Sequence, residues 1–124
     1  MALRDFIVHE LGEQIDAKLT YPASGGEAGD PGLVGDMPCI LYTDQDADGN
    51  AVVRFQGVYR FTVHGANGAG NAAITANAAG YFDPAPGGDN PNLNIDATNG
   101  SRFGTILDAV SSGAKTVVRV RIHR

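Results

Sequence analysis

Short runs of apolar and β-branched residues, separated by turn-forming residues, recur along most of the chain. The clearest pair is 39–43 and 51–55, which flank the polar segment 44–50 with its Asp-Gly dipeptide. Asp-Gly between two apolar runs is a strong signal for a β-hairpin. A further strand is predicted at 58–64, where aromatic and β-branched residues dominate. The middle of the chain is therefore predicted to form consecutive short strands.

The most regular alternation lies at the end of the chain. Residues 103–110 are apolar and β-prone, and in 116–124 an apolar residue occupies every second position from Val118 to Ile122. Arg119 and Arg121 lie between those apolar positions. Because successive side chains of a strand point to opposite faces, one face of this strand is predicted to be buried. Arg119 and Arg121 are then candidates for contact with a partner or with another subunit on the open face.

Segments dense in glycine and proline predict loops. The longest are 22–32 and 84–92. Residues 65–70 are also glycine-rich but lack the Gly-Lys-Ser/Thr ending of a phosphate-binding loop, so we interpret them as a flexible loop. The alanine-rich segment 72–79 is compatible with either a helical turn or a short strand.

Many short strands with closely spaced turn signals predict an all-β fold. We expect a small β-barrel or sandwich with long Gly/Pro-rich loops, since no long segment shows helical periodicity and no internal repeat is visible. A length of 124 residues suits one folded domain. The loop after Tyr21 suggests an N-terminal arm and loop over residues 1–31, followed by a β-rich domain over residues 32–124.

Charge is unevenly distributed between the two ends of the chain. Residues 1–50 hold ten acids and two bases, giving −8, whereas residues 51–124 hold four acids and seven bases, giving +3. Such asymmetry suits contact between copies or with a partner of mixed charge. The net charge of −5 argues against nucleic acid, whose phosphates require a concentrated basic face.

The apolar runs are too short for a membrane span, which requires about 20 residues. The first ten residues also lack the apolar core of a secretory signal and carry acids early. We therefore expect no membrane partner and synthesis in a cytosol.

Catalytic chemistry has no sequence feature to support it. The single cysteine, Cys39, lies in an apolar run without a recognisable base nearby, and we interpret it as a small buried hydrophobe. His64 is expected to be a surface or strand-end histidine. No Ser/His/Asp order or carboxylate pair stands out, so we predict neither enzymatic activity nor a cofactor.

The segment that begins at Asp44 resembles the start of a calcium loop. Asp44, Asp46 and Asp48 alternate and Gly49 follows, but the twelfth position, where a bidentate Glu is needed, holds Phe55. Aspartate and glycine are also what ordinary turns use. We therefore predict an acidic hairpin turn and no metal site.

Several elements follow one another in an order that resembles the small capsid decoration (cement) proteins of tailed phages, across residues 32–124. The first elements are a glycine-led apolar strand (32–35), a polar turn (44–50) and a valine-rich strand (52–61). A Gly-x-x-aromatic-Asp-like element (80–83) follows. The ending is a glycine-containing strand (103–109) that leads to alternating valines and arginines (116–122).

The resemblance implies a β-barrel-like subunit that forms a homotrimer on the outside of the capsid. Such a protein binds the major capsid protein, bridges its neighbouring subunits and is a structural part of the virion. An N-terminal arm that becomes ordered on the shell would suit this role. Phe6, Ile7 and Val8 are then the residues expected to anchor the arm to the capsid.

Two other functions remain open at this point. One is a carbohydrate- or cell-surface-binding β module, although the chain has no Trp and its Tyr and Phe residues lie mostly within predicted strands. The other is a different phage morphogenetic component, from the tail or the head–tail connector. Oligomeric state separates the latter from a decoration protein, because a connector or tail ring contains six or more subunits.

Overall fold

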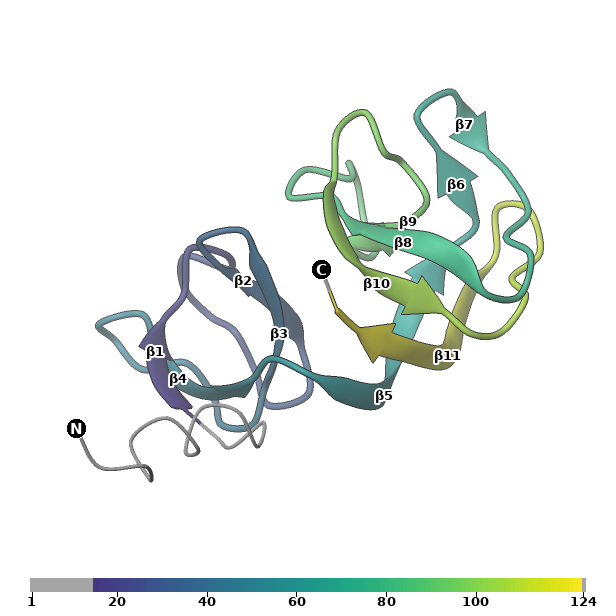
Figure 1. The fold of residues 1–124 in the computed structure, drawn as a ribbon. Coiled ribbons are helices and arrows are strands. Elements are labelled where there is room, and N and C mark those ends of the chain that lie inside the picture. The colour runs from purple at the N-terminus through teal and green to yellow at the C-terminus, as the bar shows by residue number, and fades with distance from the viewer. Residues whose placement is uncertain (1–14, 124) are drawn as a thin grey trace.

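The computed structural model describes residues 15–123, and within this range the secondary structure is β-strand with no helix. Figure 1 shows two halves joined directly by the long strand β5. The predicted all-β fold with a small barrel is therefore confirmed. Nowhere in residues 15–123 is there a helix with the length and apolar character that crossing a membrane requires.

The N-terminal half is an antiparallel sheet in the order β1-β4-β3-β2. Its strands are β1 (Ile15–Lys18), β2 (Pro31–Val34), β3 (Met37–Leu41) and β4 (Asn50–Arg54). The β3–β4 hairpin predicted from Asp-Gly is present, with Leu41 opposite Val53. Asp46 closes the turn, because its Oδ1 accepts the amides of Asp48 and Asn50, each at 2.9 Å. The acidic turn is thus held by its own carboxylate.

The predicted N-terminal arm differs from what the structure shows over residues 15–31. Strand β1 pairs with β4 over four residues, from Ile15 opposite Val53 to Lys18 opposite Asn50. The predicted boundary after Pro31 falls inside β2. The loop composition of 22–32 suggested that the residues before it are separate from the folded domain. They are not separate, because β1 and β2, which flank this loop, belong to the same sheet. Residues 15–31 are therefore part of a folded half.

The C-terminal half is a closed barrel in the order β10-β11-β5-β9-β8. Its strands are β5 (Gly57–His64), β8 (Ala78–Phe82), β9 (Leu93–Asn94), β10 (Ser101–Ile106) and β11 (Lys115–Ile122). Strands β5 and β11 pair along their whole length, from Lys115 opposite His64 to Ile122 opposite Gly57. Val118, Val120 and Ile122 are buried, which confirms the alternation predicted for the last strand.

Two local features of this half differ from the sequence interpretation. The glycine-rich segment 65–70 contributes to a small hairpin of β6 (Ala66–Asn67) and β7 (Gly70–Asn71) rather than an open loop. The segment 72–79, which fitted either a helical turn or a strand, is irregular up to the start of β8 at Ala78, with one isolated bridge from Ile74 to Val110.

An aromatic core joins the two halves. Phe61, Phe82 and Phe103 pack inside the barrel, with the Phe61 and Phe103 ring centroids 5.5 Å apart. Leu33 and Ile40 of the four-stranded sheet belong to the same buried cluster. Because apolar side chains from both halves share one core, the halves pack as a single unit.

Candidate interaction surface

The outer side of the β5–β11 pair is an open, two-stranded surface. Its side chains alternate with the buried ones, so they point away from the core. We call this surface the β5–β11 face; it consists of Val58, Arg60, Thr62, Lys115, Val117, Arg119 and Arg121. Four of the seven side chains are cationic, and the two valines are 53% and 57% exposed. The face therefore combines positive charge with uncovered apolar area.

Two of these arginines lie directly opposite each other. Arg119 pairs in register with Arg60, and like charges in that position repel. Asp108 lies just beyond the end of β10 and offsets the repulsion by forming a bidentate salt bridge with Arg119. Its Oδ1 accepts from Nη2 at 2.7 Å and its Oδ2 from Nε at 3.1 Å.

The same contact fixes the protonation state of Asp108. The hydrogen bonds from the Arg119 side chain and backbone lower the pKa of Asp108 to about 2, with smaller Coulombic contributions from Arg119 and Arg60. Asp108 is consequently ionised near neutral pH. Lys115, Arg60 and Arg121 remain as cations of the face that take part in no salt bridge within the described residues.

Two hollows adjoin the β5–β11 face. A cleft of about 380 Å³ lies between the two halves, lined by Arg60 and Val117 of the face and by residues of the loop after Tyr21, including Asp30. A second hollow of about 470 Å³ lies where β5 begins and β11 ends, lined by Val58 and Arg121. Residues of the face thus line both hollows, so a partner that covers the face would also contact them.

The sequence predictions locate only part of this surface. Arg119 and Arg121 lie on it as open-face residues, whereas Phe6, Ile7 and Val8 lie outside the described residues. The sequence analysis did not identify the β5 residues of this face. Their signal was present in the alternation of 58–62, which places Val58 and Arg60 on the same side of the strand.

The other predicted sites concern chemistry rather than contact. Cys39 is fully buried, and burial raises its pKa to about 12, so its thiol is protonated at neutral pH. Among residues 15–123 no three His, Cys, Asp or Glu side chains lie close enough to hold a metal ion together. His64 does end a strand, as predicted, but it is buried rather than at the surface.

Comparison with known proteins assigns no relatives. No protein-family model, no curated protein and no solved structure matches the chain.

Proposed function

We propose that this chain is a structural decoration (cement) protein of a tailed-phage capsid. In this role it binds the outside of the shell as a homotrimer, bridges neighbouring subunits of the major capsid protein and has no enzymatic activity. The observation that carries the proposal is the β5–β11 face, with its four cationic and two exposed valine side chains and the two hollows that it helps to line. The order of elements along the sequence supports the same assignment.

The chemistry of the face suits docking onto a large surface. Burial of the exposed valines under a partner favours binding by about 25 cal/mol per Å² of apolar area buried. The cations of the face favour a partner patch rich in carboxylates, and such complementarity chiefly sets orientation and association rate. One copy adds a modest interface, but symmetric repetition over a shell multiplies its effect.

The first test is the mass of the purified full chain by light scattering at several concentrations. A particle of three times the 12.9 kDa monomer mass supports a decoration protein. A ring of six or more copies would instead indicate a connector or tail component. The second test is co-sedimentation with expanded cognate capsids that lack the protein. A chain that stays monomeric and fails to co-sediment would overturn the proposal.

A charge-reversal pair tests the role of the β5–β11 face. Arg121→Glu replaces an exposed cation of the face, whereas Lys18→Glu makes the same charge change at an exposed position of β1 in the other half. We expect Arg121→Glu to weaken capsid co-sedimentation by about tenfold or more, because a like charge opposes the partner patch. Lys18→Glu should bind as the unaltered protein does. Equal binding of both variants would exclude the β5–β11 face as the contact.

The N-terminal residues have a separate test. We expect replacement of Phe6, Ile7 and Val8 by Ser to reduce capsid binding, because this removes the apolar side chains assigned as anchors. Unchanged co-sedimentation of the triple variant would show that these residues do not anchor the chain.

A further inference from the structure

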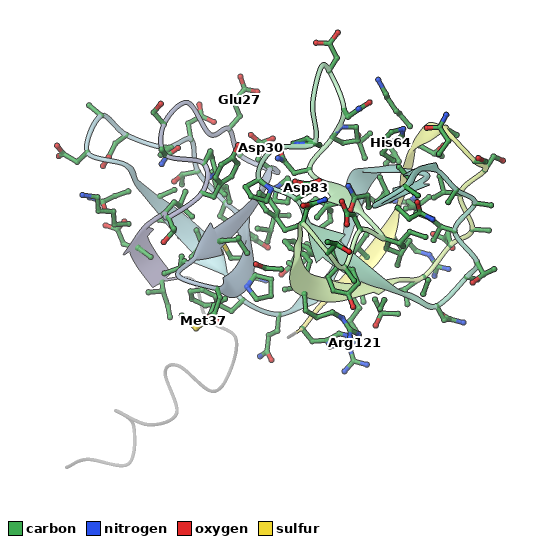
Figure 2. All side chains as sticks on the ribbon, turned by 90° about the horizontal axis from the view of Figure 1, so that it is seen from above. Glu27, Asp30, Met37, His64, Asp83 and Arg121 are labelled. Atoms are coloured by element: carbon green, nitrogen blue, oxygen red, sulfur yellow. The ribbon has the colours of Figure 1, made fainter. Side chains whose placement is uncertain are left out.

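The β6–β7 hairpin carries an Asn-Gly dipeptide at its tip. Figure 1 shows the hairpin projecting from the barrel half, at the upper right. It begins two residues after His64, which Figure 2 labels on the same half. Asn67 ends β6 and pairs with Gly70 of β7, so Gly68 and Ala69 form a two-residue turn between them. All four residues of the tip are exposed, and water therefore reaches the dipeptide.

Asn-Gly is the dipeptide in which an asparagine side chain reacts most readily with its own backbone. The amide nitrogen of the glycine attacks Cγ of the asparagine, and glycine has no side chain to obstruct the approach. The chain contains two such dipeptides, Asn67-Gly68 and Asn99-Gly100. The local sequence gives both the same reacting groups, so a difference in reactivity has to come from their surroundings in the fold.

The attacking nitrogen is open at one dipeptide and held at the other. The nitrogen of Gly68 forms no hydrogen bond within residues 15–123. That of Gly100 donates to the carbonyl oxygen of Asp96 at 3.1 Å. Packing also restrains Gly100, since a Cβ there would lie 2.8 Å from that oxygen and 2.8 Å from Cβ of Tyr81. Only the Gly68 nitrogen is therefore free to turn towards a side chain.

The two asparagine side chains are also held differently. Asn67 Oδ1 accepts the amide of Ala69 at 2.8 Å. Negative charge develops on this oxygen when Cγ is attacked, so the Ala69 N–H stabilises it as a backbone donor does in an oxyanion hole. Asn99 instead donates through Nδ2 to Asp96 Oδ2 at 2.9 Å. This places a carboxylate against the nitrogen that has to leave and makes Cγ of Asn99 less electrophilic.

The hairpin is able to open without disturbing the barrel. Ring closure requires Asn67 to leave its strand conformation, which breaks the pairing at the tip. The β6–β7 sheet consists of two residue pairs and is separate from the closed barrel. Short exposed elements of this kind open locally at a small cost in free energy. The Asn99 turn resists the same change, because the Asp96 carboxylate also accepts the amides of Thr98 and Asn99.

We propose that Asn67 is a site of spontaneous deamidation and that the fold protects Asn99. The Gly68 nitrogen gives its proton to solvent and forms a bond to Cγ of Asn67, and the Cγ–Nδ2 bond breaks with release of ammonia. Water then opens the resulting succinimide at either carbonyl. The products are an aspartate at position 67 and an isoaspartate linkage, in which the chain continues through Cγ.

The modification changes the charge and the backbone of the hairpin. Asn67 lines a hollow of about 400 Å³ together with Asp83 and Asp96, so a new carboxylate there meets like charges. An isoaspartate linkage also adds a backbone atom and shifts the pairing of Asn67 with Gly70. Deamidation thus loosens the hairpin while the barrel stays folded. This site is independent of the β5–β11 face and of the proposed capsid role.

The test is incubation of the purified full chain at neutral pH, followed by peptide mapping with mass spectrometry. One sample is kept in native buffer and one in guanidinium chloride. In buffer we expect Asn67 to convert about tenfold faster than Asn99 or more, because a frayed hairpin opens far more often than packed backbone. In denaturant the two rates should become similar.

Three results of this experiment would overturn the proposal. They are equal rates at the two dipeptides in native buffer, faster conversion at Asn99, and conversion at neither dipeptide in buffer during a period in which both convert in denaturant. The unfolded sample shows that each dipeptide is able to react, so protection in the folded chain is measured directly.

A matched pair of variants locates the modification. Asn67→Ser removes the reactive amide, while the serine hydroxyl is still able to accept the Ala69 amide. Asn99→Ser makes the same change at the protected dipeptide. Anion exchange separates the more acidic product, which we expect to accumulate in the unaltered chain and in Asn99→Ser but not in Asn67→Ser. Its accumulation in Asn67→Ser at the unaltered rate would contradict the assignment. If Asn99→Ser does not fold, the peptide map of the unaltered chain still decides the proposal.

Discussion

At the scale of single residues, the contact between Asp108 and Arg119 has the clearest consequences. It lets two arginines, Arg60 and Arg119, stand opposite each other on neighbouring strands. Both partners are partly exposed, Arg119 at 52% and Asp108 at 35% of the side chain, so solvent screens the pair. Its main effect is therefore to orient Arg119 on the β5–β11 face rather than to stabilise the fold strongly.

The depressed pKa of Asp108 predicts a pH dependence of stability. Because the folded-state pKa is about 2 and the unfolded value about 4, the stabilisation is present above pH 4 and is lost as the pH falls through 2. We expect Asp108→Asn to lower the free energy of unfolding slightly at pH 6 and to match the unaltered protein near pH 2. Urea unfolding at both pH values measures this. A constant difference between the two proteins at both pH values would contradict it.

The sequence indicated only part of this residue-scale detail. The alternation in 116–124 placed Arg119 and Arg121 on the open face correctly. Nothing in the spacing marked Asp108, because it reaches Arg119 across the β10–β11 connection. Likewise Asp83 and Asn94 are ordinary loop-forming residue types, and they come close together only because the barrel brings their strand ends together.

At the scale of elements, the packing of the two halves depends strongly on Tyr21. Its ring meets Phe82 of β8 edge-on, with centroids 5.2 Å apart. Its hydroxyl donates a hydrogen bond to the carbonyl oxygen of Pro84 at 2.6 Å. One side chain from the N-terminal half thus makes an aromatic contact and a hydrogen bond to the barrel half.

We expect Tyr21→Phe to lower the free energy of unfolding by about 0.5–1.5 kcal/mol, the usual contribution of one hydrogen bond. The ring and its packing on Phe82 remain, so the fold should be unchanged. Tyr81→Phe is the matched control, because the Tyr81 hydroxyl forms no hydrogen bond within residues 15–123. Chemical denaturation of both variants measures the difference. Equal stability of the two variants would show that the Pro84 hydrogen bond does not contribute.

Strand prediction was most accurate where the pattern was local. The β3–β4 hairpin and the long strands β5 and β11 follow directly from Asp-Gly and from alternating β-branched residues. The participation of β1 could not be inferred in this way, since it pairs with β4 across more than thirty intervening residues. Closure of the barrel by the two-residue strand β9 could not be predicted from the sequence either, because it depends on a single parallel pairing of Leu93 with Val63.

At the scale of the whole molecule, charge is separated by face as well as by half. The C-terminal half carries four acids, of which Asp83 and Asp96 are buried and Asp108 is paired with Arg119. Its cations on the β5–β11 face therefore remain largely uncompensated, although the chain as a whole is acidic. A partner that meets this face experiences a local positive field, and the net charge of −5 does not describe it.

This local field predicts how partner binding depends on salt. Exposed charges interact over a Debye length of about 10 Å at 0.1 M salt and only about 3 Å at 1 M. We expect co-sedimentation with cognate capsids to weaken as salt rises, mainly through slower association, while burial of Val58 and Val117 keeps part of the affinity. Arg121→Glu should show a shallower salt dependence than Lys18→Glu, because only the former removes charge from the face. Binding that is independent of salt in both variants would mean that the capsid contact lies elsewhere on the molecule.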